Sequence, residues 1–233
     1  MTHGPAGRAD ARAAAPAVDT RCEDCMPATA AGADEQWLRN ARYARWLAWA
    51  SMAWMAAECI VGLAAGFAAG SIALVGWALG SGIEGLASVI VVWRFTGSRM
   101  LSETAEQRAQ RAVAVSFWLL APYIAIEAIH DLAAHHPAVA TPVGIVLTAS
   151  SLMIMPVLGI AKRRLGERLD SGATAGEGTQ NLLCAAQAAG VLLALVVVAV
   201  WPGGWPIDPI IALGVAAWSA WEGNRAWRGA NCC

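Results

Sequence analysis

Charged residues are scarce in this chain: Asp, Glu, Lys and Arg make up 14% of its 233 residues, against roughly 25% in a typical soluble domain. Tyr and Phe are also rare, with two and three copies, whereas 58% of the residues are hydrophobic. A water-exposed surface of this composition would be largely apolar. The composition therefore argues against an ordinary soluble enzyme and a nucleic-acid-binding protein, and it predicts an integral membrane protein.

The first 43 residues lack an apolar core of the length that a signal peptide needs. They are polar, rich in Ala, Pro and Gly, and without a sustained apolar period. We therefore expect a disordered cytoplasmic N-terminal arm over residues 1–43. Two of the six cysteines, Cys59 and Cys184, lie inside apolar runs, which argues against a secreted disulfide framework.

After this arm the chain consists of apolar segments, each long enough to cross a bilayer as a helix of about 20 residues. They predict an all-α transmembrane domain of six helices over residues 44–228, followed by a short Cys-containing cytoplasmic tail at 229–233. The predicted helices cover residues 44–66, 71–95, 112–134, 141–161, 178–201 and 208–227.

Lys and Arg are distributed unevenly between the predicted linkers. The linkers 67–70, 135–140 and 202–207 contain neither residue, whereas 96–111 and 162–177 are basic. In a six-helix topology all 16 basic residues fall on one side of the membrane. The positive-inside rule then predicts that both termini lie in the cytoplasm and that the protein is a multi-pass protein of the cytoplasmic (inner) membrane.

Several acidic residues lie within the predicted spans, where an ionisable group costs at least ~2.5 kcal/mol on insertion scales. Glu58, Glu84 and Glu127 lie deepest in their segments. Because a deep side chain cannot easily reach water, each of the three is a candidate functional group.

Polar residues also lie along one face of the fifth predicted helix and of the residue that precedes it. A polar stripe on an otherwise apolar helix must face the protein interior or a wet cavity. The stripe consists of Glu177, Gln180, Asn181, Cys184 and Gln187.

The second predicted helix has a shorter polar stripe, formed by Ser81, Glu84 and Ser88. If the two stripes face each other, carboxylate, thiol and amide groups surround a cavity in mid-membrane. Such a mixture suits a borderline-soft ion such as Zn²⁺ better than Mg²⁺ or Ca²⁺, which prefer oxygen ligands alone. The alternative is that these groups form hydrogen bonds that only hold the helices together.

Three runs resemble one family. They are AAGSIALVGWALGSGIEGLAS at 68–88, NLLC at 181–184 and DPIIALGVAAW at 208–218. They are similar to the cation diffusion facilitators, six-helix antiporters of divalent metal ions and protons. The chain looks closest to a short bacterial branch that lacks the C-terminal cytoplasmic domain and often ends in paired cysteines, as Cys232 and Cys233 do here.

The resemblance implies a transport site with two ligands, four residues apart, on each of helices 2 and 5. In helix 2 these positions fall on Gly80, where the family usually has Asp, and on Glu84. In helix 5 they fall on Gln180 and Cys184. Nearby groups could compensate for the missing Asp. The candidate metal ligands are therefore Glu84, Cys184, Gln180, Glu177, Ser81 and Glu58.

These observations favour a secondary transporter that exports a divalent transition-metal cation, Zn²⁺ or else Cd²⁺, Co²⁺ or Fe²⁺, from the cytoplasm in exchange for protons. We expect a homodimer in the lipid bilayer with no permanently bound cofactor. Two alternatives stay open: a transport-deficient relative that acts as a metal sensor or as a subunit of a competent transporter, and a carrier of an organic substrate. The sequence contains no HExxH, GxSxG or phosphate-loop motif that would predict an enzyme.

Overall fold

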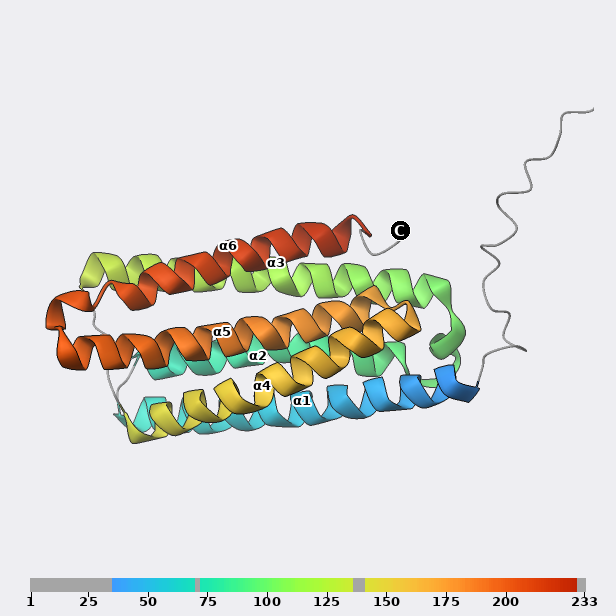
Figure 1. Cartoon of the computed structure of the whole chain (residues 1–233), viewed down its shortest axis with the longest axis horizontal. Helices are drawn as coiled ribbons and strands as arrows, with labels where there is room; N and C mark the ends of the chain where they lie inside the picture. Colours follow the sequence, from blue (N-terminus) through green and yellow to red (C-terminus); the bar gives the residue numbers. More distant parts are fainter. Residues whose placement is uncertain (1–34, 70–71, 136–140, 230–233) are drawn as a thin grey trace, which may run out of the picture. The chain divides into compact units, whose positions relative to one another are not determined.

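The computed structural model describes residues 35–69, 72–135 and 141–229, and these are helical apart from short connections (Figure 1). Five helices, α1 to α5, are long and apolar enough to cross a membrane, and α6 packs along α3. The all-helical, six-helix prediction is confirmed. The elements are α1 (Glu35–Ala69), α2 (Ile72–Arg94), η2 (Gly97–Leu101), α3 (Glu103–Ala134), α4 (Pro142–Leu169), α5 (Gly172–Val200), η3 (Pro202–Gly204) and α6 (Ile207–Trp227).

The helices extend beyond the predicted spans at their basic ends. The predicted linkers 96–111 and 162–177 are wrong, because α3 begins at Glu103 and only Asp170 and Ser171 separate α4 from α5. Both connections carry local end signals: the Ser102 hydroxyl accepts a hydrogen bond from the backbone of α3, and the Ser171 hydroxyl accepts one from α5. Hydropathy marks where a helix leaves the apolar layer, which is not where the helix ends.

The predicted start of the first helix at residue 44 is also wrong, since α1 begins at Glu35. Packing contacts stabilise the first turns of α1, and hydropathy alone does not predict them. The Trp37 ring lies 6.5 Å from the Phe95 ring, and Ala41 is buried on the same side as Ala44. The predicted arm therefore loses its last nine residues to α1, and its residues 1–34 lie outside the described part of the chain, as does the tail from residue 230.

The helices pack most extensively in three pairs: α4 with α5, α1 with α2, and α3 with α6. At the basic ends of the helices a partly buried ion pair connects these helix pairs. Arg94 Nε of α2 lies 2.7 Å from Glu106 Oε2 of α3, and Glu106 also accepts hydrogen bonds from the Ser171 hydroxyl and from the backbone N–H of Ala173. One carboxylate thus links α2, α3 and the N-terminus of α5.

Glycines allow α4 and α5 to approach closely. A Cβ added to Gly178 would lie 2.7 Å from the backbone oxygen of Gly159, and one added to Gly166 would lie 2.6 Å from the backbone nitrogen of Ala175. Small residues at such contacts let helices in lipid approach each other at backbone distance. This close contact brings the polar face of α5 against α4.

Replacing Gly178 by Ala should therefore destabilise the protein by about 1–3 kcal/mol, because the new methyl group can only be accommodated by moving the α4 backbone. The measurement is the melting temperature of the purified protein in detergent, followed by size-exclusion chromatography after heating. Gly214→Ala is the matched control, since no atom of the described residues outside its own turn of α6 lies within 4 Å of its added Cβ. A control variant that melts as low as Gly178→Ala would contradict the prediction.

Candidate functional site

A cavity of about 180 Å³ lies among α2, α3, α4, α5 and α6. It extends from Glu84 and Cys184 inside the bundle to Thr141 and Asp208, where α4 and α6 begin. These ends of the helices are joined by the linkers that contain no Lys or Arg. Carboxylates, hydroxyls and a thiol on an otherwise apolar wall make the cavity suitable for a cation.

Glu84 and Cys184 form the inner end of this cavity. Both side chains line it and interact electrostatically, so the polar stripes of α2 and α5 meet here. Both residues are buried, with exposures of 4% and 1%. Glu84 Oε2 is buried and has no hydrogen-bond partner among the described residues. A buried carboxylate oxygen without a donor is ready to accept a cation or a proton.

Glu58 of α1 lies behind this pair rather than on the cavity wall. Its carboxylate accepts hydrogen bonds from the Ser81 hydroxyl at 3.4 Å and from the Ser151 hydroxyl. It also interacts electrostatically with Glu84 and Cys184. Ser81 faces the cavity, so this hydroxyl connects the Glu58 carboxyl group to the cavity wall.

Two other predicted ligands point elsewhere. Gln180 donates a hydrogen bond from Nε2 to the Ser116 hydroxyl of α3 at 3.1 Å, and Glu177 pairs with Lys162 at 2.6 Å. Neither lies on the cavity wall. In the described part of the chain, no group of three or more His, Cys, Asp or Glu side chains is arranged to hold a metal ion. The structure therefore brings together Glu84 and Cys184, with Ser81 and Glu58 beside them, but not the full predicted set.

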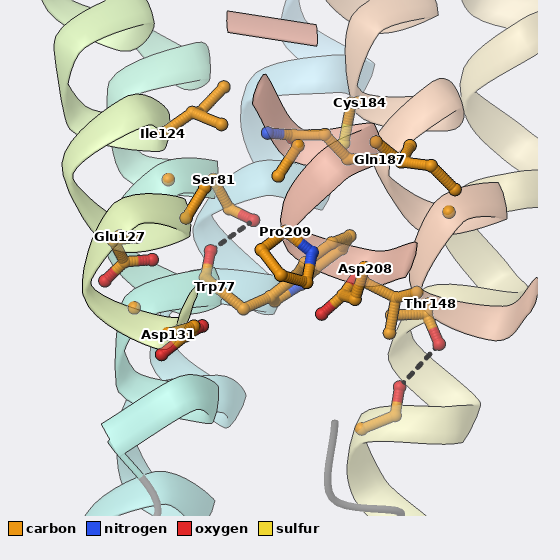
Figure 2. Close-up of a pocket in the computed structure, with 18 of the residues that line it drawn as sticks. Trp77, Ser81, Ile124, Glu127, Asp131, Thr148, Cys184, Gln187, Asp208 and Pro209 are labelled. Atoms are coloured by element: carbon orange, nitrogen blue, oxygen red, sulfur yellow. Dashed lines mark hydrogen bonds between the residues drawn. The ribbon is translucent and has the colours of Figure 1, made fainter. Parts of the chain in front are cut away.

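The outer half of the cavity is acidic. Glu127 and Asp131 of α3 and Asp208 of α6 line it, together with Gln187 of α5 (Figure 2). The Glu127 carboxylate rests against Gly76, where any Cβ would collide with it. Several carboxylates therefore line the cavity between Glu84 and the ends of the helices.

Two of the buried or cavity-lining charged residues are not predicted from the sequence. Asp208 lies at the start of an apolar run, and Lys162 lies in a predicted basic linker. A signal for Lys162 does exist, since it continues a stripe with spacings of three and four residues along the buried face of α4. That stripe consists of Thr148, Ser151, Met155, Gly159, Lys162, Gly166 and Leu169.

Long apolar helices around an acidic cavity define a multi-pass membrane protein with a route for cations. The family model of the cation efflux transmembrane domain matches residues 48–225, which is most of the chain. The chain belongs to the cation efflux family, that is, the cation diffusion facilitators, whose members transport cations across membranes.

Gly80 stands where the resemblance of the sequence implies an Asp. This residue lines the cavity, one helical turn from Glu84. Among the described residues outside its own turn of α2, an added Cβ there would meet Tyr123 Cε1 at 3.5 Å, which is an ordinary contact. The cavity therefore has space for a side chain at position 80, where glycine provides none.

Proposed function

We propose that this protein exports a divalent transition-metal cation, with Zn²⁺ as the best candidate, from the cytoplasm in exchange for protons. One observation carries the proposal: Glu84 and Cys184 meet at the inner end of a cavity that leads to the helix ends without Lys or Arg. By the positive-inside rule these ends lie outside the cytoplasm, so the cavity is the release route.

Competition for the same ligands would couple the metal ion to protons. A thiol and a carboxylate must lose their protons to bind a metal ion, so protons that enter the cavity displace it. Cysteine selects for soft and borderline ions such as Zn²⁺ and Cd²⁺, whereas Mg²⁺ and Ca²⁺ require oxygen ligands. Glu84 and Cys184 are the principal ligands, and Ser81, Glu58 and water complete the set. We place Gln180 and Glu177 outside it, because they bond to Ser116 and Lys162.

The remaining features follow from the sequence and the family. We propose that the protein lies in the cytoplasmic membrane with both termini inside, and that it functions as a homodimer. It carries no permanent cofactor, since the metal ion is the transported substrate.

The test is Zn²⁺ flux into proteoliposomes that contain the purified full-length protein. With an acidic lumen we expect Zn²⁺ to accumulate in exchange for outgoing protons, and a protonophore should stop it. The same assay with Cd²⁺, Co²⁺, Fe²⁺ and Mg²⁺ gives the selectivity, with Mg²⁺ expected to be excluded. If no ion is transported although the protein is folded and correctly inserted, the proposed transport function is overturned.

The lack of a ligand side chain at Gly80 favours one alternative, a metal-binding protein that does not transport. Such a protein acts as a sensor or as a subunit of a transporter. It predicts stoichiometric Zn²⁺ binding by the purified protein together with no flux in the vesicles. Binding measured on the same preparation as flux therefore separates the two functions.

A further inference from the structure

A second polar cluster lies inside the bundle, and the proposed metal site does not use it. Lys162 of α4 and Glu177 of α5 are 0% and 1% exposed, and Nζ lies 2.6 Å from Oε1. The ammonium group also donates to the Ser51 hydroxyl of α1 at 2.5 Å and to Asn181 Oδ1 at 3.1 Å. These four residues, the Lys162 cluster, join three helices.

The Lys162 cluster lies on the cytoplasmic side of the cavity. Glu177 precedes Cys184 by seven residues of α5, which is roughly 10 Å along a helix axis, toward the basic end of the bundle. None of the four residues lines the cavity. The cavity thus ends at Glu84 and Cys184 and does not continue to the basic end.

Two methionines fill the interval. Met55 of α1 and Met155 of α4 are 3% and 0% exposed and pack in one cluster with Cys184. Met155 Sδ also accepts a hydrogen bond from Asn181 Nδ2 at 2.9 Å, so this cluster is directly bonded to the Lys162 cluster. Together they separate Cys184 from the cytoplasmic ends of the helices.

An ion pair contributes little net stabilisation if its only role is to hold α4 against α5. Burial of two charges costs about as much as their attraction returns, and apolar side chains of equal size often stabilise a protein more. An ion pair differs in one respect: both partners are well solvated once water reaches them. A contact made by an ion pair can therefore open to water at a smaller cost than an apolar contact.

We infer that Lys162 and Glu177 form the cytoplasmic gate of the transport route. The structure holds the gate closed, with the cavity open toward the opposite side. Separation of the pair, with Ser51 and Asn181 left to water, admits the metal ion to Glu84 and Cys184 from the cytoplasm. This inference rests on the proposed transport function and adds the residues that control access.

The experiment measures access to Cys184 in the full-length protein with Ser in place of the other five cysteines. The protein is reconstituted in vesicles, and a membrane-impermeant maleimide is applied to one face at a time. Labelling from the face without Lys or Arg should be fast, and labelling from the basic face slow. Glu177→Gln leaves a buried ammonium without its counter-charge, so the basic-face rate should rise roughly tenfold or more.

Lys162→Met with Glu177→Met is the opposing variant, because it replaces both charged side chains with flexible apolar ones of similar size. The apolar contact should stay closed, so the basic-face rate should fall below that of the unmodified pair and Zn²⁺ flux should drop. A purely structural pair predicts an unchanged basic-face rate in this variant, and that result would overturn the gate even if Glu177→Gln fails to fold.

Labelling of Cys184 requires no transported ion. A gate that responds as expected in vesicles without flux would therefore refute the transporter and not the gate. Normal Zn²⁺ flux, together with a rate of Cys184 labelling that is unchanged in both variants, would refute the gate alone.

Discussion

Replacement of Glu84 by Gln is expected to abolish Zn²⁺ binding and flux. The substitution preserves the size of the side chain and removes the charge at the inner end of the cavity, where Oε2 has no donor among the described residues. Loss of groups that merely orient a metal ligand already costs 10- to 100-fold in affinity, so removal of a ligand should cost at least about 100-fold. Isothermal titration with Zn²⁺ and the vesicle flux assay both measure the effect.

Glu103→Gln is the control for this experiment, since Glu103 is exposed at the start of α3, outside the cavity. Cys184→Ser should lower Cd²⁺ and Zn²⁺ affinity in the same assay, whereas Cys59→Ser should not, because Cys59 does not line the cavity. Zn²⁺ affinity within a few-fold of the unmodified protein in Glu84→Gln would place the metal site elsewhere.

The second large effect concerns the missing carboxylate of α2. Glu58→Gln should weaken Zn²⁺ binding by roughly 10- to 100-fold, because the charge that interacts with Glu84 and Cys184 and orients Ser81 is lost. Adding Gly80→Asp to this variant should restore most of the affinity. The added Asp would lie on the cavity wall one turn from Glu84, and its Cβ would make an ordinary contact with Tyr123 Cε1.

A structural role of Glu58 alone makes a different prediction. In that case Glu58→Gln lowers the melting temperature, and Gly80→Asp restores neither stability nor binding. Glu222→Gln is the control, since Glu222 pairs with Arg225 near the opposite end of α6. Measurement of the melting temperature and the Zn²⁺ affinity on the same samples separates the two roles.

The closed Lys162 cluster and the open acidic cavity together describe one state of an alternating-access cycle. Glu177 and Cys184 lie on one face of α5, seven residues apart, so a movement of α5 against α4 would affect both. The glycine contacts between these helices leave no spare volume at Gly159 and Gly178. We therefore expect the gate to open by rotation of the Lys162 and Glu177 side chains away from each other, while α1, which contributes Ser51, moves against the closely packed α4–α5 pair.

Hydropathy and the distribution of Lys and Arg predict an all-helical membrane protein, and the polar stripes of two apolar segments place Glu84 and Cys184 at one cavity if the two stripes face each other. These signals are local: each depends on residues within one helix, and a bilayer imposes the same length and polarity on every span. The resemblance to the cation diffusion facilitators, carried by three short runs, was confirmed by the family match to residues 48–225.

Contacts between distant segments determined the rest. Lys162, Glu177 and Ser51 meet because α1, α4 and α5 pack together, and Gln180 turns to Ser116 because α3 lies beside α5. Helix periodicity identifies the face on which a side chain lies, but not the helix that this face meets. For a buried charge the partner decides its role, since Glu84 lies open to a cavity whereas Glu177 is neutralised by an ammonium group.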